Sequence, residues 1–334
     1  MSAWIQTAKS LYAQTFISGD PPITEANCPD QTGRVLIVTG GTAGVGFELS
    51  NILYASNGTV YIAARSQERA EAAIARIKSA NPDSKGQLHF LHLDLSDLST
   101  IKTSANEFLK KESQLHVLFN NAGVANPPPN SRSAQGHELH LGTNCLGPYL
   151  FTRLVLPALR TASASSPPNT VRIIWASSQT VDMLAPAGGI VPSELRNPQW
   201  ERGPRMYSQS KVGNWFLAAR FAQEFKAANE NIVSITVNPG NLKSEIWRNY
   251  PTLNYYAISW MLKPSIWGAY TDLWAGLSEE VTVEDGGRYV LPWGKWHPCP
   301  REDILEGMKT VEEGGTGVMK EFGEWCDEFT REFM

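Results

Sequence analysis

Short, mainly apolar runs alternate along most of the chain with longer stretches in which apolar residues recur at helical spacing. The runs lie at residues 34–38, 59–64, 88–95, 115–119 and 171–176. Such runs are typical of strands that are buried on both faces of a parallel sheet. Because helical stretches separate the runs, the pattern predicts an α/β fold with a doubly wound parallel sheet.

A glycine-rich turn follows the first predicted strand. Its sequence, residues 39–46, is T-G-G-T-A-G-V-G, and helical spacing resumes at residues 47–54. A strand, a glycine turn and a helix start place backbone N–H groups and the positive end of a helix dipole where a pyrophosphate can bind. The glycine spacing G-x-x-x-G-x-G differs from the common dinucleotide pattern, but its place between a strand and a helix favours nucleotide binding over an ordinary loop.

The end of the second predicted strand bears on which dinucleotide binds. Arg65 stands there, 19 residues after Gly46, followed by Ser66. An acidic residue near this point would bind a ribose 2′-hydroxyl, whereas an arginine accommodates a 2′-phosphate. A charge-assisted bond of roughly 1.5 to 3 kcal/mol corresponds to about a 10- to 150-fold preference for NADP over NAD. The alternative is an arginine that is simply solvated at a strand end.

Tyr207 and Lys211 lie four residues apart, just before a stretch with helical apolar spacing at residues 212–225. On a helix, this spacing puts the phenol and the ammonium on one face. A phenol with a pKa of about 10 is a poor acid-base group at neutral pH, and a nearby cation in a partly dry cleft can lower that pKa by ~2 to 3 units. The same spacing also arises by chance in surface helices, so its meaning depends on the other segments.

Polar residues follow three further predicted strands. Asp94 lies at the end of the third, Asn-Asn-Ala-Gly at residues 120–123 follows the fourth, and Ser177 and Ser178 follow the fifth. Ligands of open parallel sheets bind beyond the carboxyl ends of the strands. Five separate segments therefore bring polar groups to one rim of the predicted sheet.

These motifs resemble those of the short-chain dehydrogenase/reductase superfamily over about residues 33–290. The family's T-G-x-x-x-G-x-G is present at residues 39–46, its N-N-A-G at 120–123 and its Y-x-x-x-K at 207–211, and Pro239-Gly240 matches its P-G. The resemblance implies a single Rossmann-type domain. Within the superfamily the chain is most similar to the retinol-dehydrogenase-like branch, which includes reductases of fungal natural-product pathways.

The resemblance implies a role for each of four catalytic residues. Tyr207 would exchange a proton with the substrate oxygen as hydride moves to or from the nicotinamide. Lys211 would lower the pKa of that phenol and bind the nicotinamide ribose. Ser178 would hold the carbonyl oxygen, and Asn144 would position a water that relays protons to solvent.

The resemblance also implies a set of contacts to NADP(H). A serine, Ser244, stands where the family usually has a threonine after the Pro-Gly pair, and its hydroxyl can still bind the carboxamide. The expected cofactor-binding residues are Gly40, Thr42, Val45, Gly46, Arg65, Asp94, Leu95, Asn121, Ala122, Gly123, Tyr207, Lys211, Pro239, Gly240, Leu242 and Ser244.

The chain divides into three expected parts. Residues 1–32 form an N-terminal helical extension and linker, residues 33–300 the NADP-binding catalytic domain, and residues 301–334 a C-terminal helical extension that wraps the fold. Residues 1–18 space their apolar side chains as in an amphipathic helix, which would dock on the domain or a partner subunit, with a membrane surface as the lesser alternative.

A substrate lobe is expected around residues 179–206 and 241–275. The first of these segments is a long connection rich in proline and without clear periodicity, which is more typical of a functional lid than of a turn. The second concentrates aromatic residues, which suits a flat or extended apolar substrate, although ordinary helix packing could explain most of them. These aromatic residues are Trp247, Tyr250, Tyr255, Tyr256, Trp260, Trp267 and Trp274.

Composition limits the classes of function. With 334 residues, 42% of them apolar, the chain can form one enlarged α/β domain. A net charge of −4 gives no reason to expect nucleic acid or an anionic membrane as a partner. No apolar run reaches the ~18 residues that span a bilayer and no signal peptide is evident, so the expected location is cytoplasmic.

Cysteine and histidine usage points to a reduced, metal-free protein. The four cysteines form no C-x-x-C motif, which suits a reducing compartment. The histidine pairs at 89 and 92 and at 137 and 140 lack the further ligands of a metal site, so no metal is expected.

The leading functional hypothesis is an NADP(H)-dependent oxidoreductase that interconverts a carbonyl and an alcohol on an apolar small molecule. An aromatic or polyketide-like substrate is a more specific form of this hypothesis. One alternative is an epimerase or dehydratase that uses the same Tyr/Lys pair, although that branch usually spaces its glycines G-x-x-G-x-x-G. Another is a non-catalytic NADP-sensing or scaffolding protein, against which the joint presence of Ser178, Tyr207, Lys211 and Asn144 argues. The sequence does not indicate whether the protein is a monomer or a homo-oligomer, nor the direction of flux.

Overall fold

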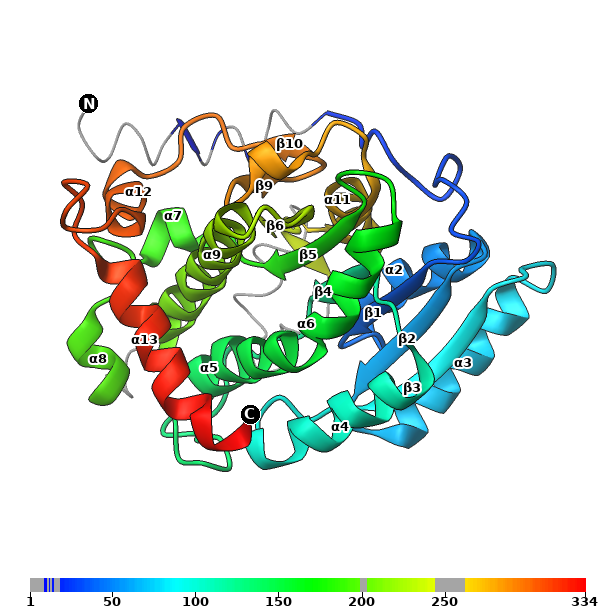
Figure 1. Ribbon diagram of the computed structural model, residues 1–334, viewed down its shortest axis with the longest axis horizontal. Coiled ribbons are helices and arrows are strands. Elements are labelled where there is room, and N and C mark those ends of the chain that lie inside the picture. The colour runs from blue at the N-terminus through cyan, green and yellow to red at the C-terminus, as the bar shows by residue number, and fades with distance from the viewer. Residues whose placement is uncertain (1–8, 11, 13, 15–18, 199–202, 244–261) are drawn as a thin grey trace.

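A mostly parallel eight-stranded sheet forms the centre of the molecule, in the strand order β10-β9-β6-β5-β4-β1-β2-β3 (Figure 1). The computed structural model describes residues 9, 10, 12, 14, 19–198, 203–243 and 262–334. The strands of this sheet are β1 Val35–Thr39, β2 Thr59–Ala64, β3 Gln87–His92, β4 Val117–Asn120, β5 Val171–Ala176, β6 Ile232–Val237, β9 Tyr289–Leu291 and β10 Lys295–Trp296. Only the β9–β10 pair is antiparallel among these neighbours.

Helices cover both faces of the sheet. The long ones are α2 Gly44–Ala55, α3 Gln67–Ala80, α4 Leu98–Lys111, α6 Gly147–Ser165, α9 Gly203–Ala227, α11 Ser265–Leu277 and α13 Val318–Thr330. The short elements are α5 Leu139–Leu141, the π-helical η1 Gly142–Leu146, α7 Thr180–Leu184, α8 Pro192–Arg196, β7 Leu242–Lys243, β8 Lys263–Pro264, η4 Val283–Asp285, α12 Glu302–Met308 and η5 Arg331–Phe333. This arrangement confirms the predicted α/β fold.

Alternation along β1 shows how the two layers are separated. Val35 and Ile37 belong to the core under α4, α6 and α9, whereas Leu36 and Val38 belong to the core under α2, α3 and α11. All four residues are buried, as the unbroken apolar run predicted. The third strand is shorter than the apolar run at residues 88–95 predicted. It ends at His92, and the residues that follow form a loop.

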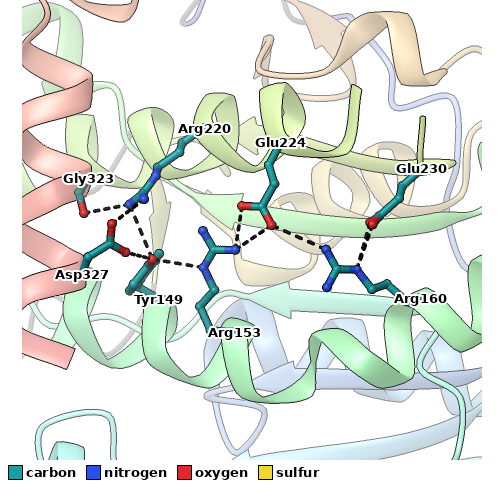
Figure 2. A network of polar contacts seen from close by, with 8 residues as sticks. All are labelled: Tyr149, Arg153, Arg160, Arg220, Glu224, Glu230, Gly323 and Asp327. Carbon is teal, nitrogen blue, oxygen red and sulfur yellow. Dashed lines mark hydrogen bonds and ion pairs between the residues drawn. The ribbon is translucent and has the colours of Figure 1, made fainter. Parts of the chain in front are cut away.

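The C-terminal helix α13 packs against α9 on one side of the molecule and crosses it in the view of Figure 1. Ion pairs join α13, α9 and α6 in one network (Figure 2). Arg220 of α9 lies 2.6 Å from the carboxylate of Asp327, which also accepts a hydrogen bond from Tyr149 of α6. Arg153 of α6 contacts Glu224 of α9 at 2.6 Å. None of the helices described combines the length and apolarity needed to cross a bilayer.

Asp272 is a buried acid on α11 that no sequence motif indicates. It is 2% exposed, and its Oδ2 has no hydrogen-bond partner among the described residues. Burial raises the pKa of this carboxyl from 3.8 to about 8. Because the folded chain then holds a proton that the unfolded chain releases, the stability present at low pH is lost as the pH rises from about 4 to about 8.

Replacing Asp272 with Asn should remove this pH dependence. We expect the variant to gain stability relative to the parent as the pH rises from 5 to 9, by a few kcal/mol at most, at ~1.4 kcal/mol per pKa unit. Thermal unfolding at several pH values measures the difference. Asp83→Asn, at an exposed position, serves as the control, and a difference that stays constant with pH would contradict the interpretation.

Candidate active site

A cavity of about 810 Å³ opens at the carboxyl ends of the parallel strands. Loops after β1 to β6 all contribute to its wall. Of the residues predicted from the sequence, it is lined by Gly40, Thr42, Val45, Arg65, Asp94, Leu95, Asn121, Ala122, Gly123, Ser178, Tyr207, Lys211, Pro239, Gly240 and Leu242. Gly46 and Asn144 lie outside the lining, and Ser244 lies outside the described residues.

The glycine turn after β1 is held in place by the loop after β4. The Thr39 hydroxyl donates to the carbonyl of Phe119 at 3.1 Å and accepts from the backbone N–H of Ala122 at 2.9 Å. The side-chain amide of Asn121 donates to the carbonyl of Thr39 at 2.9 Å. These contacts explain why the T-G and N-N-A-G motifs occur together, since each fixes the backbone of the other.

Helix α2 begins at this turn without a capping side chain and without an acidic residue in its first turn. Its first N–H groups are therefore available to an anion. Gly46 is required by space, because a Cβ there would lie 2.5 Å from the carbonyl oxygen of Gly40 and 2.7 Å from Nδ2 of Asn121. The turn is thus suited to a pyrophosphate group, because the first N–H groups of α2 can donate to its oxygens and the positive end of the α2 dipole attracts its charge.

The adenosine end of the cavity carries cations. Arg65 and Arg69 are both exposed and both line it, one at the end of β2 and one in the first turn of α3. Ser66 lies between them and caps α3 by accepting from the N–H of Arg69 at 3.2 Å. Asp94 is fixed as well, because it accepts from the N–H and the hydroxyl of Ser96 at 2.9 and 2.6 Å. Sequence reasoning missed Arg69, although its position one helical turn after Arg65 is a usable signal.

Tyr207, Ser178 and Lys211 meet at the other end of the cavity. The Ser178 hydroxyl hydrogen-bonds the phenol of Tyr207. The ammonium of Lys211 is buried, donates to the carbonyl of Ala176 at 3.0 Å and lies 5.7 Å from the centre of the Tyr207 ring. The sequence therefore predicted correctly that α9 and the end of β5 bring these three side chains together.

The proton affinities differ from the expectation. Burial raises the pKa of Tyr207 to about 12, although the hydrogen bond from Ser178 works in the opposite direction. Burial also lowers the pKa of Lys211 to about 8. The expected lowering of the phenol's pKa by Lys211 is therefore wrong, because desolvation of the phenol outweighs a cation that already hydrogen-bonds the backbone.

Asn144 takes a structural position behind the cavity. It is fully buried in η1, its Oδ1 accepts from the N–H of Val124 at 2.8 Å, and its Nδ2 donates to the Val124 carbonyl and to the Ser210 hydroxyl at 3.0 Å each. A Cβ on Gly123 would lie 3.2 Å from both Asn144 Oδ1 and Lys211 Nζ. Asn144 therefore orders the loop after β4 beside Lys211, and its side-chain bonds are made to protein groups rather than directed into the cavity.

Part of the apolar wall comes from residues that the sequence did not single out. Met183 and Leu184 of α7 line the cavity and are 49% and 46% exposed, respectively. Leu139, Pro204 and Leu262 line it as well. The long connection after Ser178 thus provides one wall of the cavity, as its length suggested.

The aromatic residues expected in the substrate lobe behave differently. Trp267 packs edge-on against Trp293 at 5.1 Å, and Trp274 against Trp296 at 5.2 Å. Neither lines the cavity, so ordinary packing, the alternative given above for most of these aromatic residues, explains both of them. Residues 247, 250, 255, 256 and 260 lie outside the described residues.

Comparisons with known proteins agree with this geometry. A family model described as short chain dehydrogenase matches residues 34–253. A short-chain dehydrogenase/reductase of Phomopsis amygdali is 42% identical over 98% of both chains, and the short-chain dehydrogenase/reductase pkfC of Emericella nidulans is 42% identical over 96% of this chain and 99% of its own. Relatives at this level span nearly the whole chain.

Solved structures show the same fold. A crystal structure of an uncharacterized protein from Mycobacterium paratuberculosis superposes with a TM-score of 0.68 at 25% identity, covering 92% of this chain and 97% of that one. The Pseudomonas aeruginosa RhlG/NADP active-site complex superposes with a TM-score of 0.61 at 22% identity, covering 81% of this chain and 99% of that one.

Proposed function

This chain belongs to the short-chain dehydrogenase family, and from that premise we propose that it is an NADP(H)-dependent oxidoreductase that reduces the carbonyl group of an apolar substrate or oxidises the corresponding alcohol. One observation carries the proposal. The hydroxyls of Ser178 and Tyr207 are hydrogen-bonded to each other in the wall of a cavity whose opposite end has the form of a dinucleotide site.

In this proposal, bound NADPH supplies the hydride. Ser178 and Tyr207 would hold the substrate carbonyl oxygen through their hydroxyls, and Tyr207 would give that oxygen a proton when the carbon is reduced. A phenol with a pKa of about 12 is fully protonated at neutral pH, so Tyr207 carries the proton that the reductive direction needs, although it is a weaker acid than a phenol whose pKa lies nearer the operating pH. Lys211, buried beside the ring, is placed to stabilise the phenolate that remains.

We assign the cationic end of the cavity to the 2′-phosphate of NADP(H). Arg65 stands at the end of β2, where the ribose of a dinucleotide lies in folds of this type, and Arg69 adds a second positive charge one turn into α3. The loop residues in the lining include no acidic side chain at the end of β2 that would select a free 2′-hydroxyl. The RhlG structure is titled as a complex with NADP, which supports the assignment by analogy.

The substrate is proposed to be an apolar ketone or aldehyde. Met183, Leu184, Leu139 and Leu262 give the substrate end of the cavity a largely apolar lining. The exposed side chains of α7 would be covered by such a substrate, which favours binding through removal of apolar surface from water. An aromatic or polyketide-like ketone is one specific member of this class.

Screening a panel of apolar ketones, aldehydes and alcohols tests the proposal. With NADPH or NADP present, we expect a change in nicotinamide absorbance that matches the amount of substrate converted. Conversion without any absorbance change would indicate an epimerase or dehydratase instead. Tight NADPH binding without conversion of any panel member would indicate the non-catalytic alternative.

A further inference from the structure

We propose that the N-terminal segment is a positioning element of the active site, acting through Ser10 and Gln14. Their side chains bind Asp182, on α7 just after Ser178, and Asn238, in the loop next to Pro239-Gly240. The catalytic consequences of this inference rest on the proposed function, whereas the contacts themselves can be tested without it.

Gln14 uses all of its amide atoms in this cluster. Its Nε2 donates to Oγ of Ser10 and to Oδ2 of Asp182, each at 2.7 Å. Its Oε1 accepts from Nδ2 of Asn238 at 2.5 Å. Ser10 in turn donates to Oδ2 of Asp182 at 2.7 Å. All four residues are at most 5% exposed. Because water cannot reach these polar groups, the side-chain hydrogen bonds must satisfy them.

His297 supplies the third donor to the same carboxylate oxygen. Its Nδ1 accepts from the backbone N–H of Cys299 at 3.2 Å, which places the ring hydrogen on Nε2. Nε2 then donates to Oδ2 of Asp182 at 3.0 Å. Two of the three donors to this buried oxygen therefore come from the N-terminal segment. Without them this oxygen would keep only the bond from His297 among the donors named here, and the position of α7, which carries Asp182, would be less stable.

Ser10 and Gln14 bind two segments, α7 and the turn after β6, and both segments reach the active site. Asp182 lies four residues after Ser178 and next to Met183, which lines the cavity. Asn238 accepts from the N–H of Gly240 at 3.0 Å and so shapes the turn after β6. The Tyr289 hydroxyl donates to the carbonyl of Ser178 at 2.9 Å, and its ring packs edge-on against His297 at 5.6 Å. The cluster therefore supports the wall that carries Ser178 from two sides.

Ser10, Asp182 and His297 are the residue types of a hydrolytic triad, but their bonds exclude that chemistry. The hydroxyl of Ser10 donates to the aspartate, and Nε2 of His297 carries a hydrogen, so the imidazole cannot accept the serine's proton. None of the three lines the cavity described above. Their arrangement serves to fix position.

The substitution Gln14→Glu tests the proposal with almost no change of shape. It replaces the N–H donor that faces Oδ2 of Asp182 with a charged oxygen, while the group that accepts from Asn238 is kept. Gln87→Glu is the matched control, because it adds the same charge at an exposed residue at the start of β3. Ser10→Ala, which removes one donor and adds no charge, is the milder second variant in case Gln14→Glu does not fold.

Three measurements on the full chain decide the outcome. With a carbonyl substrate from the panel, we expect Gln14→Glu to lower kcat about tenfold or more, because small displacements of positioning groups are costly. The Kd of NADPH should rise by a smaller factor than kcat falls, since the turn at Pro239-Gly240 is loosened while the cationic end of the cavity is untouched. Amide hydrogen exchange should accelerate about tenfold in residues 177–185 and 236–242, and not elsewhere in the sheet. Gln87→Glu should show none of these changes.

Unchanged kcat and unchanged exchange in a folded Gln14→Glu or Ser10→Ala protein would overturn the proposal. Equal acceleration of exchange throughout the sheet would overturn it as well, because it would mark a general loss of stability. If the parent protein converts no carbonyl at all, the proposed function fails, while local exchange in the two segments still decides whether the N-terminal segment positions them.

Discussion

Replacing Tyr207 with Phe is expected to lower kcat by about a hundred- to ten-thousandfold, the range that a positioned proton donor contributes. The substitution removes only the hydroxyl. Ser178 and Lys211 stay in place, and the ring continues to fill its space beside His140, with which it packs edge-on at 5.8 Å. NADPH should therefore bind with an unchanged Kd, so a fluorescence titration separates loss of the proton donor from loss of the site.

Tyr54→Phe provides the control for this substitution. Tyr54 lies on α2, is almost completely buried and does not line the cavity, so removal of its hydroxyl tests for a general effect of the exchange. It should leave kcat unchanged. Full activity in the Tyr207→Phe variant would remove Tyr207 from the chemical step and leave only a dinucleotide-binding fold.

Replacing Arg65 with Glu is expected to reverse or abolish the preference for NADPH. Loss of a charge-assisted bond to the 2′-phosphate costs roughly 1.5 to 3 kcal/mol, which weakens NADPH binding about 10- to 150-fold, and repulsion by the new carboxylate adds to this. NADH lacks the 2′-phosphate, so its Kd should change little. Titrations of NADPH and NADH measure the ratio of their two dissociation constants. Repeating them at low and moderate salt shows how much of that ratio is due to electrostatic attraction, which salt screens.

Arg76→Glu separates a direct contact from a general change in charge. Arg76 lies on the same helix, α3, and packs over the Phe47 ring at 4.5 Å outside the main cavity. The substitution Arg76→Glu changes the net charge by the same amount as Arg65→Glu. If both variants weaken NADPH equally, or if the ratio of the two dissociation constants stays the same in Arg65→Glu, the assignment of Arg65 to the 2′-phosphate is wrong.

The features that the sequence predicted well are local ones. The apolar run at residues 34–38 and the adjoining glycine turn specify a strand and a helix start through contacts within a few residues, so they are visible in the sequence itself. The spacing of Tyr207 and Lys211 sets their relation on α9 in the same way. Their meeting with Ser178 could be predicted because strands of a parallel sheet end at a common rim.

The features that the sequence did not predict depend on distant partners or on burial. Ser10 and Asp182 are 172 positions apart, and Ser10 and His297 are 287 apart, so no local pattern links them. The aromatic residues Trp267 and Trp274 suit either a substrate wall or ordinary packing, and only their distant partners, the rings of residues 293 and 296, show that these two serve packing. The proton affinity of Tyr207 was misjudged because its desolvation depends on every element around it.

The outer side of α9, the helix that bears Tyr207, has a consequence for synthesis of the protein. Arg220 precedes its partner Asp327 by 107 positions, and Phe322 and Trp325 of α13 are buried beside the same helix. During synthesis, the surface of α9 that α13 covers is therefore exposed to solvent until α13 has been translated. We expect the nascent chain to depend on chaperones during that interval, and to become resistant to proteases only after α13 has docked.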